Sequence, residues 1–200
     1  MGIAAVIFDI GNVLIGWQPE RFYDARIGRG AREALFSAVD LHAMNDRIDA
    51  GEGFAKVVAD TQAAHPDHAE PIGWWQSHWS DLAGPEVPGT AELLDRLKAR
   101  GVPVHALSNI SREAFEMAGR DYPALSRFDR AFVSGDMRLT KPDPAIYRAV
   151  EEALGILPER LLFIDDRAEN VEAAAARGWR VHHFTEAATL ETRLIREGLL

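Results

Sequence analysis

Residues 3–14 constrain the fold of this chain more than any other segment. The segment begins with an apolar run that ends at Phe8 and then changes abruptly to Asp9 and, one residue later, a Gly-Asn pair. A short apolar run with β-branched and aromatic residues predicts a strand buried on both faces, as in parallel sheets, and Gly-Asn indicates a tight turn. In open α/β sheets, ligands bind at the carboxyl ends of the strands. We therefore expect Asp9 to lie at a binding site; the alternative is that its carboxylate only caps the turn.

Later segments repeat this pattern of an apolar strand followed by polar residues. The expected strands are 102–107 before Ser108-Asn109, 131–133 before Ser134-Gly135-Asp136, 161–164 before Asp165-Asp166, and a last strand at 179–181. Helical periodicity lies between them, at 90–100, up to Met117, at 144–154 and around Asn170. Strands that alternate with helices of this length predict an α/β fold with a parallel sheet covered by helices on both faces.

The segment from Pro19 to about Leu82 has helical periodicity and no expected strand. A turn-rich exit at 15–19 and a linker rich in Pro and Gly at 83–89 connect it to the rest of the chain. The division into domains is therefore residues 1–16 and 84–200 for the α/β core and residues 17–83 for a helical insertion. Within the insertion, one apolar stripe is expected, while Trp74 and His78 share another face that could flank a pocket. The stripe comprises Ile72, Trp75, Trp79 and Leu82.

Composition limits the classes of partner and chemistry. A net charge of −9 without long blocks of like charge argues against nucleic acid or an anionic membrane as the main partner. The absence of cysteine excludes disulfides, thiolate nucleophiles and cysteine-ligated metals. No apolar run approaches the length of a membrane span, and the first strand leaves no room for a signal peptide, so we expect a cytoplasmic protein. The sequence does not indicate an oligomeric state.

The polar strand ends are expected to meet at one edge of the sheet. Asp9, Ser108-Asn109 and Asp165-Asp166 would converge there, and Lys141 lies in a loop that can reach them. Carboxylates bind a hard cation such as Mg²⁺, and the cation and the lysine together can neutralise a phosphoryl group. An aspartate can then attack phosphorus to form a covalent intermediate. The alternatives are a solvated Lys141 and a helix-capping role for one of the paired aspartates.

This arrangement resembles the haloacid dehalogenase-like superfamily, chiefly its phosphatases. The resemblance lies in four motifs that span nearly the whole chain outside residues 17–83. These are Asp9-Ile10-Gly11-Asn12-Val13-Leu14, Ser108-Asn109, Lys141-Pro142, and Ile164-Asp165-Asp166 with Asn170. It implies a Rossmann-like parallel sheet sandwiched by helices, and the insertion looks like the family's small all-helical cap domain. The first motif and the paired acids look most like bacterial sugar-phosphate phosphatases such as the glucose-1-phosphate phosphatase group.

The resemblance implies roles at matching positions. Asp9 would be the nucleophile and a magnesium ligand, with the Gly11 carbonyl and Asp166 as further ligands. Asp165 and Asn170 would orient the metal and its waters. Ser108 and the Asn109 backbone would bind the phosphoryl oxygens, and Lys141 would pair with the phosphate and with Asp9. The implied activity is magnesium-dependent hydrolysis of a small phosphorylated metabolite through an aspartyl-phosphate.

One position departs from the family pattern. Most of these phosphatases place a second Asp two residues after the nucleophile, to protonate the leaving oxygen, and Gly11 occupies that place here. General acid catalysis contributes roughly 10²–10⁴-fold. We therefore expect either a preference for better leaving groups or an acid supplied by the helical insertion, with His78 and Asp49 as candidates.

Two other functions remain open from the sequence. A 2-haloacid dehalogenase needs no proton donor, although those enzymes usually carry an aromatic residue at the position of Gly11 and need no acid pair for a metal. A non-catalytic regulator that binds a phosphorylated ligand is the other alternative, against which Asp9, Lys141 and Asp166 speak. Specificity is expected to lie in the insertion, where Arg47 could meet a second anionic group. Four of the five tryptophans also lie there or at its edge: Trp17, Trp74, Trp75 and Trp79.

Overall fold

A five-stranded parallel sheet is the centre of the α/β part of the computed structural model, which describes residues 2–200. Its strands, in chain order, are β1 (Ala5–Phe8), β4 (Val104–Ser108), β5 (Arg130–Val133), β6 (Leu161–Asp165) and β7 (Arg180–His183). Their order across the sheet is β5-β4-β1-β6-β7, so β1 is central and β4 and β6 flank it. The expected fold class is confirmed, and the polar ends of three adjacent strands lie at one edge.

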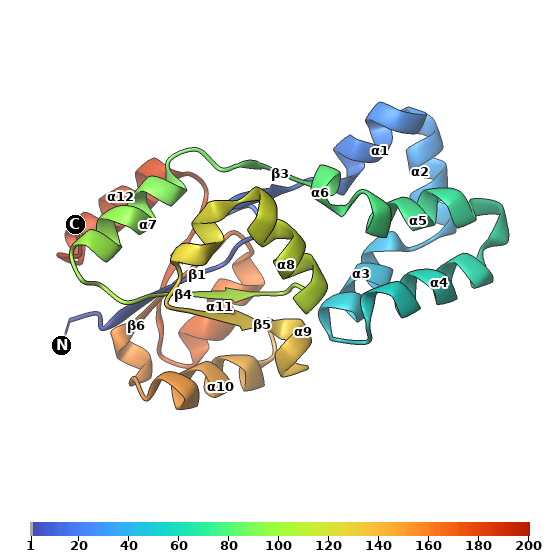
Figure 1. Cartoon of the computed structure of the whole chain (residues 1–200). Helices are drawn as coiled ribbons and strands as arrows, with labels where there is room; N and C mark the ends of the chain where they lie inside the picture. Colours follow the sequence, from blue (N-terminus) through green and yellow to red (C-terminus); the bar gives the residue numbers. More distant parts are fainter. Residues whose placement is uncertain (1) are drawn as a thin grey trace.

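Helices cover both faces of this sheet (Figure 1). They are α7 (Thr90–Ala99), α8 (Arg112–Asp121), α9 (Ser134–Met137), α10 (Pro144–Leu154), α11 (Ala168–Ala176) and α12 (Ala187–Arg196), with short 3₁₀ turns at Pro123–Arg127 and Pro158–Arg160. Side chains alternate along a strand, so Val6 and Phe8 of β1 pack with α7 and α12, whereas Ile7 packs with α10 and α11. All four β1 residues are therefore buried, as the unbroken apolar run predicts.

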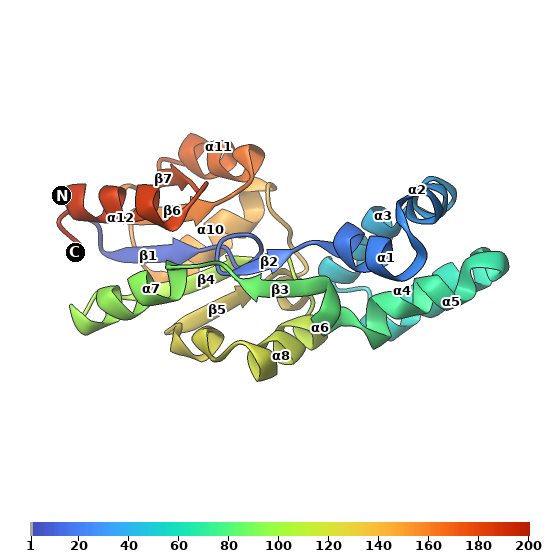
Figure 2. The same ribbon diagram turned by 90° about the horizontal axis from the view of Figure 1, so that it is seen from above.

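The insertion forms a separate layer of helices beyond the sheet edge (Figures 1 and 2). It contains α1 (Pro19–Ile27), α2 (Arg29–Ala38), α3 (Leu41–Asp49), α4 (Phe54–Ala64), a 3₁₀ turn at Pro66–His68, α5 (Ala69–Ser77) and α6 (Trp79–Leu82). We call these elements the helical layer. The expected apolar stripe is buried in it, but the chain forms two helices that break at His78. The domain boundaries after residues 16 and 83 stay a prediction.

Two short strands join the helical layer to the sheet. β2 (Ile15–Trp17) and β3 (Ala83–Glu86) pair antiparallel and form a ribbon (Figure 2). The segments expected to be a turn-rich exit and a linker therefore contain strands that the sequence analysis did not predict. Glycine and proline lower the strand propensity of both segments, and their pairing joins residues far apart in the chain, so no local pattern indicates it.

No helix among residues 2–200 is long and apolar enough to cross a membrane.

Candidate active site

Three carboxyl groups converge where β1 and β6 end. The register of the two strands pairs Phe8 with Ile164, so Asp9 and Asp165 follow at adjacent positions, and the Asp9 N–H donates to the Ile164 carbonyl at 2.8 Å. Asp9, Asp165 and Asp166 each offer a carboxylate oxygen, and these oxygens lie within 4.8 Å of one another. The sheet edge thus brings together residues separated by more than 150 positions, as expected from the sequence.

Lys141 lies at the centre of this cluster and is fully buried. Its Nζ contacts Asp9 Oδ1 at 2.9 Å and Asp165 Oδ2 at 2.7 Å, and it donates to the Leu107 carbonyl at 3.0 Å. These three acceptors match the three protons of an ammonium group. The alternative of a solvated lysine is wrong.

Asp165 is held by more groups than any other carboxyl in the cluster. Besides Lys141, its oxygens accept hydrogen bonds from Asn170 Nδ2 at 3.0 and 3.1 Å and from the Arg167 N–H at 2.8 Å. With its side chain 0% exposed, Asp165 is suited to fix Lys141 and the start of α11 rather than to ligate a cation directly.

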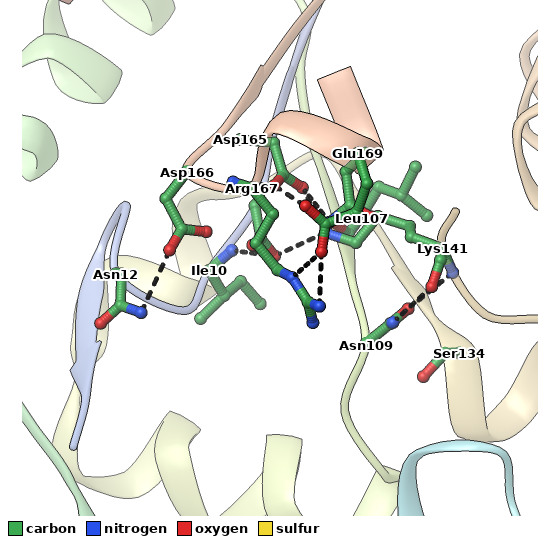
Figure 3. Close-up of polar contacts among 12 residues, drawn as sticks. Ile10, Asn12, Leu107, Asn109, Ser134, Lys141, Asp165, Asp166, Arg167 and Glu169 are labelled. Carbon is green, nitrogen blue, oxygen red and sulfur yellow. Dashed lines mark hydrogen bonds and ion pairs between the residues drawn. The ribbon is translucent and has the colours of Figure 1, made fainter. Parts of the chain in front are cut away.

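Asn12 reaches the site although the sequence analysis assigned it no role. Its Nδ2 donates to Asp166 Oδ2 at 3.1 Å (Figure 3), while its Oδ1 accepts the Trp17 N–H at 2.9 Å. The residue has a φ of 54°, a left-handed conformation that Asn tolerates better than most side chains. The Gly-Asn pair after the strand was the signal that could have identified it.

Ser108 and Asn109 lie at the end of β4, next to β1. Both line the cavity described below. The Asn109 side chain is used within the protein, because it accepts the Lys141 N–H at 2.8 Å and donates to the Lys141 carbonyl at 2.9 Å (Figure 3). It therefore fixes the loop that carries the lysine, and the expected phosphate contact falls to the Asn109 backbone and the Ser108 hydroxyl.

Burial controls the electrostatics of the cluster. It raises the pKa of Asp9 to about 6, and Lys141 acts in the opposite direction. Burial also raises the pKa of Asp166, against the hydrogen bond from Asn12. On its own, burial would lower the pKa of Lys141, but Asp9 and Asp165 outweigh it and the net shift is upward. The lysine is thus a permanent positive charge beside two carboxylates.

These donors fit a small divalent cation. Asp9 and Asp166 supply hard oxygen ligands next to the Gly11 backbone, which also borders the cavity. Burial disfavours their charged forms, and a cation would remove that penalty. Asp9, Asp166 and Gly11 would hold the ion, with Asp165 and Asn170 orienting the cluster from behind.

A cavity of about 560 Å³ opens above the cluster, between the sheet edge and the helical layer. The sheet side contributes Asp9, Ser108, Lys141 and Asp166, and the other side contributes Trp17, Glu20, His42, Asn45, Asp46, Asp49 and Trp79. No lysine or arginine of the helical layer borders the cavity among the described residues.

Three expectations about the insertion were wrong. Arg47 does not line the cavity and instead binds Glu52 at 2.8 Å. His78 lies outside the cavity, where its Nδ1 is 3.0 Å from Asp81. Trp74 packs on the Tyr23 ring, at a centroid distance of 5.9 Å, and flanks no pocket among the described residues. These side chains instead make their contacts within the helical layer.

The comparison with known families agrees with this geometry. A family model described as haloacid dehalogenase-like hydrolase matches residues 3–178. The chain therefore belongs to the haloacid dehalogenase-like hydrolases, a family of enzymes.

Its relatives include both phosphatases and dehalogenases. Phosphoglycolate phosphatase 1 of Pseudomonas aeruginosa is 37% identical over 160 residues, which cover 80% of this chain and 54% of that protein. An (S)-2-haloacid dehalogenase of Pseudomonas fluorescens is 34% identical over 92 residues, 46% of this chain and 40% of that enzyme. The matches thus span about half the length of these relatives.

A solved structure shares the fold over nearly the whole chain. It is a HAD family enzyme from Bacteroides thetaiotaomicron in complex with magnesium and inorganic phosphate. The TM-score is 0.72 at 23% identity, with 92% of this chain and 96% of that chain covered.

Proposed function

We propose that this protein is a magnesium-dependent phosphomonoester hydrolase that acts through an aspartyl-phosphate. The observation that carries the proposal is the buried contact of Lys141 with Asp9, beside Asp166, at the floor of a cavity. A nucleophilic carboxylate, an ammonium group and a two-carboxylate metal site are the parts that phosphoryl transfer requires.

The reaction follows from these positions. An Asp9 oxygen attacks phosphorus, the bond from phosphorus to the leaving oxygen breaks, and water later hydrolyses the aspartyl-phosphate to release inorganic phosphate. The Ser108 hydroxyl binds a phosphoryl oxygen, Lys141 places its positive charge beside the phosphoryl group, and Asp165 holds the lysine in place. A bound Mg²⁺ would neutralise negative charge that develops on those oxygens.

The wall of the cavity limits the rest of the substrate. The helical layer contributes the acidic residues Glu20, Asp46 and Asp49 and no lysine or arginine to the described lining. A second negative charge facing this wall would meet these carboxyl groups with no lysine or arginine beside them, and Arg167, on the sheet side of the cavity, is paired with Glu169. We therefore propose a substrate whose organic part is uncharged and rich in hydroxyl groups, as in a sugar phosphate; the glucose-1-phosphate type stays a prediction.

The test is a substrate panel with and without Mg²⁺, with Asp9→Asn beside the wild type. Magnesium-dependent phosphate release that Asp9→Asn abolishes is the expected result. Halide release from 2-haloacids without metal would instead identify a dehalogenase, and no turnover of either class would favour a ligand-binding regulator. Within the panel, an uncharged sugar phosphate should be hydrolysed faster than phosphoglycolate, whose carboxylate is a second negative charge. Faster hydrolysis of phosphoglycolate would refute the proposal that the acidic residues of the helical layer disfavour a second negative charge on the substrate.

A further inference from the structure

Asp49 is a buried carboxyl group at the boundary between the helical layer and the sheet. It is the last residue of α3, a helix capped by Asp40, whose side chain accepts the Ala43 N–H at 2.9 Å. The buried face of α3 continues from Leu41 through Ile48 to Asp49, which is 9% exposed. The helical period of α3 therefore places the Asp49 carboxyl on the buried face of the helix.

A close contact between two backbones fixes the position of Asp49. A Cβ on Gly51 would lie 2.4 Å from the Gly135 carbonyl oxygen, so the turn after α3 approaches α9 more closely than any other residue type allows. The Ser134 hydroxyl donates to the Asp49 carbonyl at 2.6 Å. The turn, drawn in cyan, lies beside Ser134 in Figure 3. Asp49 is therefore anchored to the sheet side of the cavity although it belongs to the helical layer.

The carboxyl itself has two neighbours that donate hydrogen bonds. Asn45 Nδ2 donates to Asp49 Oδ2 at 2.8 Å, and the Ser111 backbone N–H also donates to the carboxyl. The Trp75 indole N–H, which can only donate, is 3.0 Å from Asn45 Oδ1, so it fixes the Asn45 amide with its NH₂ group toward Asp49. Ser111 is two residues beyond Asn109, which places the carboxyl beside the proposed phosphate-binding residues.

The environment favours the protonated form of Asp49. Burial raises the pKa of Asp49 well above its ordinary value, and Asp46 and Asp9 act in the same direction, against the bonds from Asn45 and Ser111. Its place at the carboxyl end of a helix also disfavours a negative charge.

Other proton carriers on the cavity wall are already engaged. The three protons of Lys141 each have an acceptor. His42 Nε2 is 3.0 Å from Glu20, and its side chain is 54% exposed. Among the carboxyls that the helical layer contributes to the described lining, Asp49 is buried, whereas Glu20 and Asp46 are accessible to solvent.

We propose that Asp49 donates the proton to the departing oxygen, an inference that rests on the proposed phosphatase function. As Asp9 attacks phosphorus, the electron pair of the breaking bond goes to the leaving oxygen, which takes the Asp49 proton and departs as an alcohol. The resulting Asp49 carboxylate accepts a proton from the water that hydrolyses the aspartyl-phosphate. Inorganic phosphate leaves, and both aspartates return to their starting forms.

The test is the dependence of kcat/KM on the leaving group. p-Nitrophenyl phosphate, whose leaving oxygen needs no proton, is compared with a simple alkyl phosphate, whose oxygen does. We expect Asp49→Asn to lower the rate on the alkyl phosphate about 10²–10⁴-fold and that on p-nitrophenyl phosphate far less. Asp49→Glu, which keeps a carboxyl group, should recover part of the alkyl rate. Asp67→Asn, which removes an exposed carboxyl of the helical layer that does not line the cavity, should leave the ratio of the two rates unchanged.

The ratio of the two rates separates the possible failures. Both substrates are measured on one preparation, so the ratio does not depend on the fraction of enzyme that folds. An Asp49→Asn ratio equal to that of the wild type would overturn the proton-donor role while the phosphatase function stands. If both rates had also fallen by the same factor, Asp49 would have a structural role. A wild type without magnesium-dependent phosphate release would instead refute the proposed function.

Discussion

Replacing Lys141 by methionine is expected to be severely destabilising. The change keeps most of the buried side-chain volume but removes an ammonium group that contacts Asp9 at 2.9 Å, Asp165 at 2.7 Å and the Leu107 carbonyl at 3.0 Å. Removing one partner of a buried ion pair costs about 3–5 kcal/mol, because the remaining charge is left without compensation. We expect a loss of this size in the free energy of unfolding, measured by urea denaturation at neutral pH with a chelator present.

A matched surface pair and a double variant test the reasoning. Lys56 contacts Asp60 at 2.6 Å, but these side chains are 69% and 48% exposed, whereas those of Lys141 and Asp165 are 1% and 0% exposed. Lys56→Met should therefore change the stability little. Adding Asp165→Asn to Lys141→Met should cost less than the two single changes together, since it removes one uncompensated charge. A Lys141→Met loss below about 1 kcal/mol would refute the claim that the lysine neutralises the cluster.

Three further results are expected. Asn12→Gly keeps the left-handed backbone but removes the hydrogen bond to Asp166, so Mg²⁺ affinity measured by calorimetry should fall about 10–100-fold; an unchanged affinity would contradict an orienting role. Mg²⁺ at 100 times its dissociation constant should raise the free energy of unfolding by about 2.7 kcal/mol, an increase that Asp166→Asn should remove in thermal melts if this carboxylate is a ligand. Burial lowers the pKa of His105 below 6.5, so the unfolded chain binds more protons there and stability should fall as the pH drops below 6.5. His105→Leu should make that decline shallower, and parallel stability curves would exclude the contribution.

The sequence was sufficient for the sheet and for the residues at its edge. Four strands of the sheet, β1, β4, β5 and β6, carry their own signal, a largely apolar run that ends in polar residues, and parallel strands necessarily bring those ends to one edge. Asp9, Lys141 and Asp166 could therefore be placed together from local patterns and the known geometry of the fold. The sequence analysis did not predict α12. Its buried residues Leu190 and Leu194 lie four positions apart, a spacing typical of a helix, so the signal was present in the sequence.

Contacts between the insertion and the sheet were beyond the sequence patterns. The contact of Gly51 with Gly135 depends on how two separately folded segments meet, and neither glycine differs locally from one in an ordinary turn. The bond from Asn45 to Asp49, by contrast, joins residues four apart on α3 and was available from helical spacing. When a side chain has several possible partners, its actual partner is known only from the three-dimensional structure.

The β2–β3 ribbon contains both covalent connections between the helical layer and the sheet. This arrangement determines which part of the chain can vary during evolution. A Cβ on Gly16 would lie 3.0 Å from the Gly84 carbonyl oxygen, so the two paired connections approach each other at a point where a side chain would be crowded. The segment between the two connections can change in length and composition without altering the sheet, provided that β2 and β3 keep their pairing. A chimera that replaces residues 18–82 with the helices of another family member should therefore inherit a new substrate wall over an unaltered catalytic floor.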